Sequence, residues 1–289
     1  MSKRKILIQL DPDPHASMFD AVVAIDAGVE HLLQHSRVEP AQVQGLVHGA
    51  MFTRGVPDLA STAIFIGGSS VAAGEELLKQ VTRCFFGPMR VSVLLDANGA
   101  NTTAVAAVLA AARHVALKGA VATVLAGTGP VGQRAARLLA RQGAAVRVAS
   151  RSLERAQETC AAIAAKVPGA SLTPVKTSST PETAAALDGA QIAIAAGAAG
   201  IELIPAEVRR NCASLQVAID LNAVPPLGIA GIEVTDKAKE RDGVNCYGAI
   251  GVGGTKMKIH RAAIERLFTA NNLVLDAEEV FAIGQELKT

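Results

Sequence analysis

A glycine-rich turn in the middle of the chain limits the possible folds more than any other feature. A short apolar run at 120–126 precedes it, a helical pattern at 130–141 follows it, and its residues are Gly127, Thr128, Gly129, Pro130, Val131 and Gly132. A GxGxxG turn between a strand and a helix is typical of Rossmann dinucleotide-binding units, where the glycines allow a tight turn, close approach to a pyrophosphate and close helix packing. We therefore predict that 127–132 bind a dinucleotide at the helix N-terminus. The alternative is an ordinary glycine turn.

The end of the next predicted strand, 144–149, indicates which dinucleotide binds. NAD-binding units carry Asp or Glu at this place, whereas this chain has Ser150, Arg151 and Ser152. A guanidinium matches phosphate geometry, and hydroxyl groups add hydrogen bonds. We predict NADP as the cofactor, with NAD bound at lower affinity. The alternative is that Arg151 is solvated and Ser152 only caps the following helix.

Two later strand ends complete the predicted cofactor site. Small residues at Ala196 and Gly197 leave room for ribose and nicotinamide, and Asn222 is suited to hydrogen-bond a carboxamide. Plain tight turns are the alternative at these positions.

Short apolar runs alternate with helical segments along the whole chain, which indicates an α/β protein with parallel sheets. At 289 residues the chain exceeds the usual size of one hydrophobic core. We predict two α/β domains with an interdomain cleft, the second a Rossmann-type parallel sheet. The first domain is 1–118 completed by C-terminal helices in 250–289, and the second is 119–249.

The predicted elements follow from periodicity and from turn residues. Strands are expected at 6–10, 45–52, 63–68, 90–96, 120–126, 144–149, 191–196 and 215–221. Helices are expected at 17–35, 71–85, 101–117, 130–141, 153–166, 181–187, 256–271 and 276–288.

Composition excludes several classes of protein. A net charge of +2, with no Trp and one Tyr, argues against a nucleic-acid-binding face. Apolar runs are too short to span a bilayer, and the stretch that follows Met1 lacks a signal-peptide cleavage site, so we expect a cytoplasmic protein. The cysteines form no CxxC pair and the histidines have no ligand spacing, so no metal site is expected.

Several longer segments resemble the methylene-tetrahydromethanopterin dehydrogenases of methylotrophic bacteria. The resemblance covers nearly the whole chain, and its NADP-dependent branch, which includes members acting on methylene-tetrahydrofolate, is the more similar. The segments are Asp11, the Phe19–Asp20 pair, 61–68 (STAIFIGG), 85–88 (FFGP), 96–103 (DANGANTT), the GTGPVG turn and 220–228 (DLNAVPPLG).

This resemblance implies a reaction in one-carbon metabolism, the oxidation of formaldehyde-derived carbon. A hydride passes from the methylene group of methylene-tetrahydromethanopterin to NADP, and a methenyl cation remains. The protein then has to position the reactants, exclude water and favour a cation, because no proton has to move. The family also implies a homo-oligomer, a trimer or hexamer. The alternatives are a methylene-tetrahydrofolate dehydrogenase, with or without a cyclohydrolase step, and a non-catalytic NADP-sensing protein.

Two charged residues are the catalytic candidates that the resemblance implies. An acid at the position of Asp20 lies near the pterin, where its charge favours the cation, although Ser17 and Asp20 also have the spacing of a capping box. Lys256 follows a glycine-rich stretch in which we expect a helix to begin, and it orients polar edges of the pterin. A solvated lysine is the alternative, and Lys258 is a nearby competitor.

Further candidates bind the substrate. Phe19 lies beside Asp20, and a polar loop after the strand predicted at 90–96 is suited to hydrogen-bond a pterin ring. This loop contributes Asn98, Asn101, Thr102 and Thr103. Helix capping by Asn101 or Thr102 is the alternative.

Overall fold

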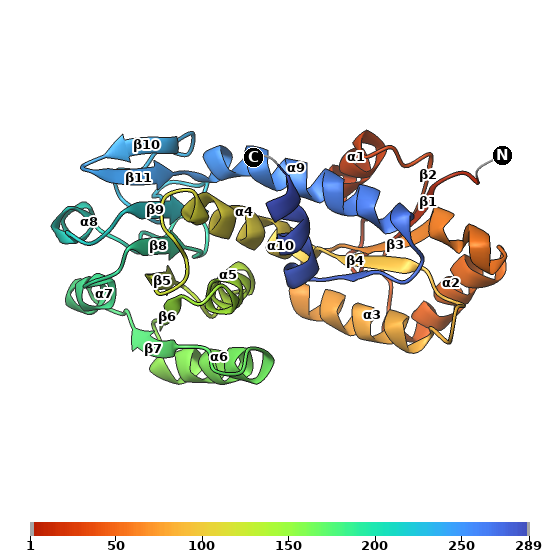
Figure 1. Cartoon of the computed structure of the whole chain (residues 1–289), viewed down its shortest axis with the longest axis horizontal. Helices are drawn as coiled ribbons and strands as arrows, with labels where there is room; N and C mark the ends of the chain where they lie inside the picture. Colours follow the sequence, from red (N-terminus) through yellow and green to blue (C-terminus); the bar gives the residue numbers. More distant parts are fainter. Residues whose placement is uncertain (1–2, 288–289) are drawn as a thin grey trace. The chain divides into compact units, whose positions relative to one another are not determined.

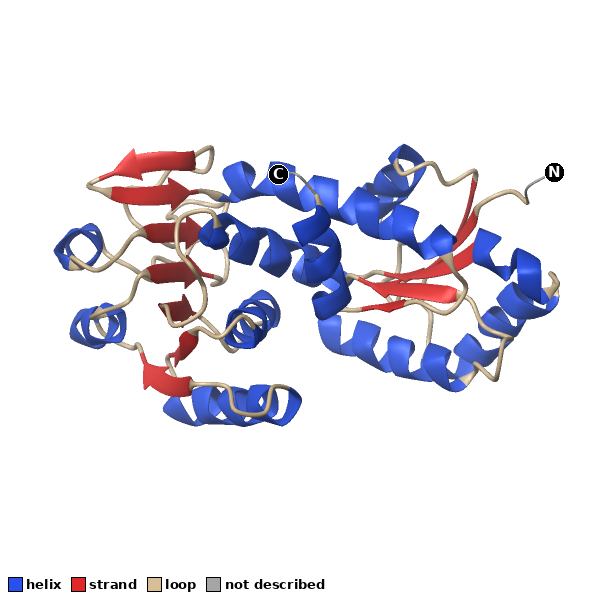
Figure 2. Cartoon of the chain, viewed as in Figure 1, coloured by secondary structure: helices blue, strands red, loops and turns tan. Residues whose placement is uncertain are grey.

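A computed structural model describes residues 3–287, so Met1, Ser2 and the end predicted for the last helix at Lys288 lie outside the described residues. The chain divides into two compact units, and each contains one sheet (Figure 1). The first unit is Met1–Thr102 with Met257–Thr289, and the second is Thr103–Lys256. Helices flank both sheets (Figure 2), which confirms the predicted α/β class.

The first unit has a parallel sheet with the strand order β12-β4-β3-β1-β2 among the described residues. The chain leaves β1 through α1 for β2 on one side, and leaves β3 through α3 for β4 on the other. The point between β1 and β3 is therefore the topological switch point, where ligands bind to sheets of this kind. The strands are β1 (Ile6–Leu10), β2 (His31–His35), β3 (Thr62–Ile66), β4 (Ser92–Leu95) and β12 (Val274–Leu275).

Helices cover both faces of this first sheet. Gly74 of α3 packs against Ile66 and Leu95, whereas Phe65, which points to the other face, stacks on His260 of α9. The helices are α1 (Met18–Asp26), α2 (Pro40–Phe52), α3 (Val71–Arg83) and α10 (Ala277–Glu286), with short 3-10 turns at Val56–Ser61, Ala97–Gly99 and Leu267–Thr269. Helices α4 (Ala100–Ala112) and α9 (Ala249–Arg266) each contribute residues to both units.

The second unit has a sheet with the order β10-β11-β9-β8-β5-β6-β7, parallel except for β10. Its switch point lies between β5 and β8, because the chain runs from β5 outward to β7 and returns to β8 on the other side. Figure 1 shows α5 and α6 on one face and α7 and α8 on the other. The strands are β5 (Val121–Leu125), β6 (Ala145–Ser150), β7 (Leu172–Lys176), β8 (Ile192–Ala195), β9 (Val217–Asp220), β10 (Lys237–Arg241) and β11 (Val244–Tyr247). The helices are α5 (Pro130–Arg141), α6 (Leu153–Lys166), α7 (Thr180–Leu187) and α8 (Ala206–Asn211).

Two predicted elements of the first unit are wrong. The helix predicted at 17–35 ends at Asp26, because Gly28 adopts a left-handed backbone with φ of 78°, and 31–35 form strand β2. The strand predicted at 45–52 is the body of helix α2. Glu39 and Gln42 form a capping box at its start, and Pro40 occupies the first turn. The residues that signal the start of this helix therefore precede the apolar run on which the strand prediction was based.

The start of α9 also differs from the prediction. We expected a glycine-rich loop and a helix from 256, but the helix begins at Ala249 and the glycines lie inside it. A Cβ atom on Gly251 would lie 1.7 Å from the carbonyl oxygen of Asp236, so this glycine allows close packing on the backbone of 233–237. Lys256 is therefore in the interior of a helix and not at its N-terminus.

Candidate active site

The glycine turn has the geometry predicted for a phosphate-binding elbow. It leaves β5 with Ala126 in the left-handed region, at φ of 51°, and enters α5 at Pro130. A Cβ atom on Gly127 would lie 2.9 Å from Val124 O, and one on Gly132 would lie 2.7 Å from Ala126 O. Since real Cβ atoms do not approach so closely, both positions require glycine for close packing of helix and strand.

Gly129 differs from the other two glycines. A Cβ atom there would meet only Ala126 O at 3.4 Å and Ala196 O at 3.8 Å, so its outer side is open. It is the N-cap residue of α5 and has no side chain to occupy the space in front of the first N–H groups of the helix. An anion at this place would gain from the free N–H groups and from the helix dipole.

A pocket of about 320 Å³ lies at the end of β6, inside the second unit. Arg151 and Arg155 both line it, and within residues 3–287 neither guanidinium makes a hydrogen bond or an ion pair. Ser152 caps α6 by accepting a hydrogen bond from the N–H of Arg155 at 3.3 Å. No carboxylate lines the pocket in the described structure; its remaining lining residues are Ala126, Thr128, Ser150, Thr177 and Leu203.

Sequence reasoning named Thr128, Ser150, Arg151 and Ser152, and missed Arg155 and Thr177. Arg155 lies in the first turn of α6, directly after the end of β6, so the predicted start of this helix at 153 was the signal for it. Thr177 follows β7, a strand that was not predicted.

Across the switch point, β8 ends at Ala195, and Ala196 and Gly197 follow. The N–H of Ala196 donates to Leu125 O at 3.1 Å, which holds this strand end beside the elbow. A Cβ atom on Gly197 would lie 2.8 Å from Leu203 Cδ1, so glycine is required there by packing.

The side chain of Asn222 makes hydrogen bonds within its own loop that the sequence did not predict. Its side chain is buried, its Nδ2 donates to Pro226 O at 3.1 Å, and its Oδ1 accepts from the N–H of Val224 at 2.9 Å. These bonds hold the loop that contains the cis Pro225–Pro226 peptide. One N–H of the amide is left for a ligand, so a contact with a carboxamide stays a prediction.

The carboxylate of Asp220 also stabilises this loop, through hydrogen bonds to its backbone. It is completely buried and accepts hydrogen bonds from the N–H groups of Asn222 at 3.0 Å and Ile229 at 2.9 Å. Burial raises the pKa of this carboxyl above its usual value, and the backbone N–H donors oppose that shift. Asp220 thus acts as a structural anchor for the end of β9.

The switch point of the first unit gathers two carboxylates. A Cβ atom on Gly67, directly after β3, would lie 3.2 Å from Oδ2 of Asp20 and 3.6 Å from Oδ2 of Asp11. Asp11 is buried and accepts from the N–H groups of Asp13 and Ser17, which fixes the loop before α1. Asp20 is partly exposed and lies at the carboxyl edge of the sheet.

The structure also places Ser17 as the N-cap of α1, where its hydroxyl accepts from the N–H of Asp20 at 3.2 Å. That bond uses the backbone N–H of Asp20 and not its carboxylate. Phe19, in the same turn, is 53% exposed.

The polar loop after β4 divides into exposed and buried residues. Asn98 is exposed, has φ of 54° and donates its N–H to Gly68 O at 2.6 Å, and Thr103 is partly exposed. Asn101 and Thr102 are buried, at 1% and 0% exposure. Asn101 Nδ2 donates to Leu95 O and to Asp276, and Thr102 donates its hydroxyl to Asp96 at 2.6 Å. The structure therefore indicates a structural role for Asn101 and Thr102, although not as caps, because both lie inside α4 and Asp96 accepts from their backbone N–H groups.

We expect Thr102→Val to lower the free energy of unfolding by about 1.5–3 kcal/mol, because it removes a buried hydrogen bond to a carboxylate while preserving shape. Denaturant unfolding measures this loss. The Michaelis constant for the substrate should not change, whereas a substrate contact by Thr102 would raise it. Thr103→Val is the matched control at the neighbouring, partly exposed threonine.

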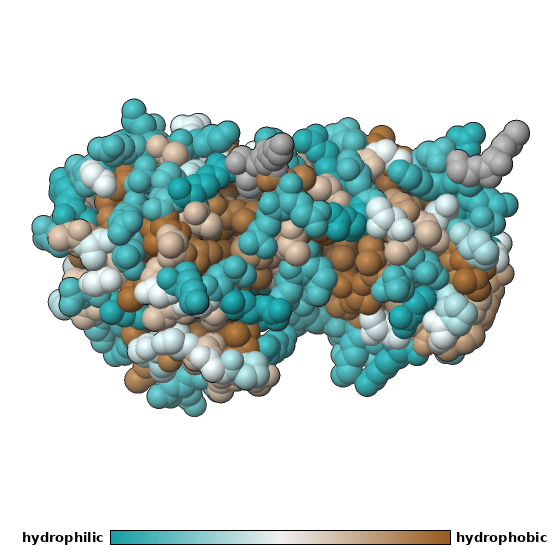
Figure 3. All heavy atoms as spheres, in the orientation of Figure 1, coloured by the Kyte–Doolittle hydropathy of each residue, from teal (hydrophilic) through white to brown (hydrophobic). Residues whose placement is uncertain are grey.

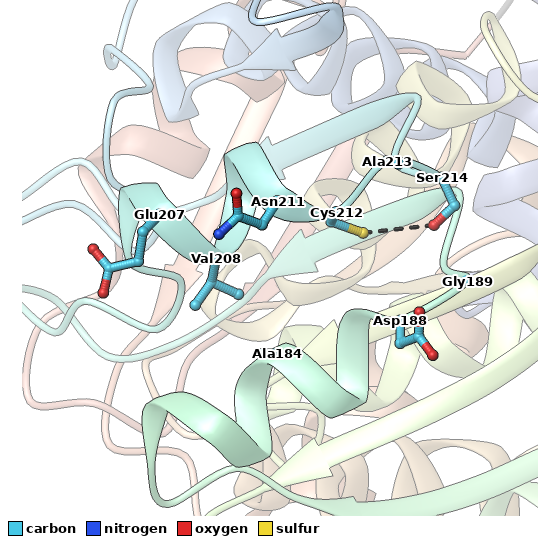
Figure 4. A pocket seen from close by; sticks show the side chains of 9 residues that line it. All are labelled: Ala184, Asp188, Gly189, Glu207, Val208, Asn211, Cys212, Ala213 and Ser214. Atoms are coloured by element: carbon cyan, nitrogen blue, oxygen red, sulfur yellow. Dashed lines mark hydrogen bonds between the residues drawn. The ribbon is translucent and has the colours of Figure 1, made fainter.

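A second pocket of about 350 Å³ lies at the amino ends of β8 and β9, away from the elbow (Figure 4). The Sγ atom of Cys212 lies 3.5 Å from the Oγ atom of Ser214 there, and the thiol donates a hydrogen bond to Leu187 O at 3.1 Å. Ligands of doubly wound sheets bind at the carboxyl edge, so this pocket is not the cofactor site.

Within residues 3–287, no cluster of three or more His, Cys, Asp or Glu side chains has the geometry of a metal site. The same residues contain no helix long and apolar enough to cross a bilayer.

A glycine elbow at the switch point of a doubly wound sheet is typical of the class of dinucleotide-binding proteins. Two solved structures share the fold. Quinate dehydrogenase from Corynebacterium glutamicum, in complex with NAD, superimposes with a TM-score of 0.53 at 16% identity, over 99% of this chain and 100% of that one. 5-Ketofructose reductase of Gluconobacter sp. strain CHM43 gives 0.51 at 16% identity, over 98% of both chains.

Sequence comparisons are more specific. Residues 18–98 match the family model described as methylene-tetrahydromethanopterin dehydrogenase, N-terminal. The bifunctional protein MdtA of Methylorubrum extorquens is 44% identical over 99% of this chain and 100% of its own. The NAD(P)-dependent methylenetetrahydromethanopterin dehydrogenase of the same organism is 31% identical over 98% and 99%. The chain belongs to the methylenetetrahydromethanopterin dehydrogenase family, as the sequence predicted, and is an NAD(P)-dependent oxidoreductase.

Proposed function

We propose that the protein transfers a hydride from methylene-tetrahydromethanopterin to NADP and so forms methenyl-tetrahydromethanopterin and NADPH. The observation that carries this proposal is full-length similarity to two relatives, one of which is named for this reaction. The glycine elbow at 127–132 supports it, because its sterically required glycines and open N-cap suit a pyrophosphate.

The preference for NADP rests on the pocket at the end of β6. Arg151 and Arg155 make no ion pair within residues 3–287, and two positive charges beside a helix N-terminus favour the 2′-phosphate of NADP. A ribose-binding carboxylate, which would repel that phosphate, does not line the pocket among the described residues. NAD retains the pyrophosphate contacts and should bind with lower affinity.

When bound, the nicotinamide ring of the cofactor supplies the electron acceptor for the hydride. The chain has to hold the ring, and Ala196 and Gly197 leave space for it beside the elbow. Asn222 has one N–H for its carboxamide.

In the first unit, the exposed ring of Phe19 and the backbone around Asn98 would contact the pterin. The carboxylate of Asp20 would stabilise the positive charge that develops as the hydride leaves. We assign Lys256 to orientation of polar pterin edges, because a positive charge at the reacting carbon would oppose the cation.

We expect Asp20→Asn to lower kcat roughly tenfold, because it removes about 1.4 kcal/mol of electrostatic stabilisation from the cationic transition state. The backbone N–H of Asp20 still donates to Ser17 in this variant, so the N-cap of α1 is kept. Asp26→Asn, at the other end of α1, is the control. Steady-state kinetics with the methylene substrate measure the effect, and an unchanged kcat would remove Asp20 from the reaction.

The four combinations of NAD or NADP with methylene-tetrahydromethanopterin or methylene-tetrahydrofolate test the reaction. Formation of the methenyl product should be fastest with NADP and the methanopterin. Faster turnover with the folate would assign the alternative substrate, and methenyl hydrolysis would add a cyclohydrolase step. Absence of any reduced nucleotide in all four assays would contradict the proposal.

Three further predictions from the sequence accompany this function. They are the substrate domain at 1–118 with 250–289 and the NADP domain at 119–249, the cytoplasmic location, and assembly into a trimer or hexamer.

A further inference from the structure

A pocket of about 250 Å³ lies beside the carboxyl end of β2, within the first unit. It is formed by the end of this strand and by the first turns of α2. A Cβ atom placed on Gly45 would meet no atom within 4 Å, so this side of α2 leaves the space unfilled. The lining residues are His35, Ser36, Val38, Gln42, Gly45 and Leu46.

The polar side chains of this pocket can all donate hydrogen bonds. Within residues 3–287, the imidazole of His35, the hydroxyl of Ser36 and the Nε2 group of Gln42 make no hydrogen bond. The Oε1 atom of Gln42 already accepts from the N–H of Glu39 at 2.8 Å, so its amide presents only N–H groups. No carboxylate lines the pocket in the described structure. Donors without an acidic neighbour suit an oxyanion, either a carboxylate or a phosphate.

Arg37 adds a positive charge, because it stands in the sequence between two of the lining residues. It is exposed, and its guanidinium makes no hydrogen bond or ion pair in the part of the chain that the structure describes. Its φ of 54° lies in the left-handed region, which glycine adopts at lower cost, so an arginine here indicates a use for its side chain. The nearby acid Glu39 is engaged in the capping box of α2.

The loop that carries Arg37 is fixed against the loop after β1. The N–H of Arg37 donates to Asp13 O at 2.8 Å, and the N–H of Val38 donates to Asp11 O at 3.0 Å. The carboxylate of Asp13 accepts from the N–H and the hydroxyl of Ser69, at 2.8 and 2.9 Å. The three loops after β1, β2 and β3 are therefore linked by hydrogen bonds, and Arg37 has a defined place among them.

The pocket lies at the same edge of the sheet as Asp20. His35 pairs with Leu10 of β1, and Leu10 pairs with Ile66 of β3, so the three strands end side by side. Neighbouring strands are about 4.8 Å apart, which places the end of β2 about 10 Å from the end of β3. Asp20 lies beside Gly67, directly after β3. A ligand bound near Asp20 and extended along this edge would reach the pocket.

We propose that this pocket and Arg37 bind an oxyanion in the acidic tail of the pterin substrate, an inference that rests on the proposed function. The methanopterin and the folate both carry an acidic tail on an aryl group, remote from the pterin ring. With the ring beside Asp20, the tail extends across the end of β1 to β2, where Arg37 attracts its charge. Apolar side chains also reach the surface of the molecule (Figure 3), but they offer no donor to an anion.

Binding of two pterins tests the site without catalysis. The probes are tetrahydromethanopterin and a tetrahydropterin that lacks the aryl group and the tail, each titrated by calorimetry. Arg37→Gln should raise the Kd of the tailed pterin about three- to tenfold at low salt and leave that of the tail-free pterin unchanged. Arg83→Gln is the matched control and should change neither Kd, because Arg83 is exposed at the end of α3, at the amino edge of the same sheet.

Filling the pocket provides a second variant. Gly45→Leu places a side chain in open space and improves the helix propensity of α2, so the fold should be kept. The new side chain would occupy the pocket and should weaken binding of the tailed pterin alone. For both Arg37→Gln and Gly45→Leu, an unchanged Kd of the tailed pterin, or an equal loss for the two pterins, would overturn the proposal.

Inorganic phosphate separates a bound tail from a free anion. It should compete with the tailed pterin and not with the tail-free one. Phosphate binding that Arg37→Gln abolishes, with no effect of this variant on the tailed pterin, would assign the pocket to a free anion and overturn the tail site. That result would leave the proposed reaction standing, whereas a wild-type protein that binds neither pterin would contradict both.

Discussion

Replacing Arg151 and Arg155 together with alanine will remove most of the preference for NADP over NAD. Each guanidinium that contacts the 2′-phosphate is expected to contribute about 1–3 kcal/mol, which corresponds to roughly a fivefold to hundredfold change in affinity. NAD lacks that phosphate, so its affinity should change little. Calorimetric titration of the two nucleotides into the single and double variants measures both effects.

Arg141→Ala is the control for this substitution, since Arg141 is exposed at the end of α5 in the same unit and does not line the pocket. It should alter neither affinity. If the double variant keeps the wild-type ratio of NADP to NAD affinity, both arginines are solvated surface residues and the assignment of the pocket is wrong.

Gly132→Ala should weaken both nucleotides to a similar extent. Its new Cβ atom would lie 2.7 Å from Ala126 O and 2.8 Å from the Cα of Gly127, so the elbow has to shift. Overpacking of this kind costs about 1–3 kcal/mol, which would lower kcat/KM roughly fivefold to hundredfold if the cost falls on the cofactor site.

Gly49→Ala is the control for this substitution. Gly49 lies in α2, and no atom lies within 4 Å of a Cβ atom placed on it, so the added methyl group meets no neighbour. It should leave catalysis unchanged and stabilise the fold by roughly 0.5–1 kcal/mol. Equal catalysis in Gly132→Ala and wild type would show that the elbow does not position the cofactor.

The sequence predicted the second unit better than the first because strand, elbow and helix form one local unit. Helix α5 has the predicted bounds, since Pro130 can start a helix and Gly143, with φ of 85°, ends it. In the first unit, the apolar pattern of 45–52 suited either a strand or a helix. The capping box upstream favours the helix at 45–52. Residues 31–35 form a strand because they pair with β1, a tertiary contact that local sequence does not reveal.

The β10–β11 hairpin was missed although its turn carried a signal. Asp242 and Gly243 have φ values of 51° and 77°, and an Asp-Gly pair with two positive φ angles is typical of a tight hairpin. Charged residues throughout β10 hid the strand, because this edge strand is largely exposed and has no apolar alternation.

The candidate site was predictable where local sequence determines the chemistry. The sequence placed the glycine elbow at the start of α5 and Arg151 at the end of β6, as the structure has them, and their contacts with a cofactor stay a prediction. The roles of Asn101 and Thr102 could not be predicted in this way, because structural hydrogen bonds and ligand binding use the same side chains and only burial separates the two roles. The gathering of Asp11 and Asp20 at Gly67 depends on strand order, which periodicity does not give.

Transfer of deuterium from a dideuterated methylene group tests the central claim most directly. With methylene-tetrahydromethanopterin labelled at that carbon, the account predicts that each NADPH formed carries one deuterium on its nicotinamide ring, which mass spectrometry detects. NADPH formed without deuterium would contradict direct hydride transfer from the one-carbon unit.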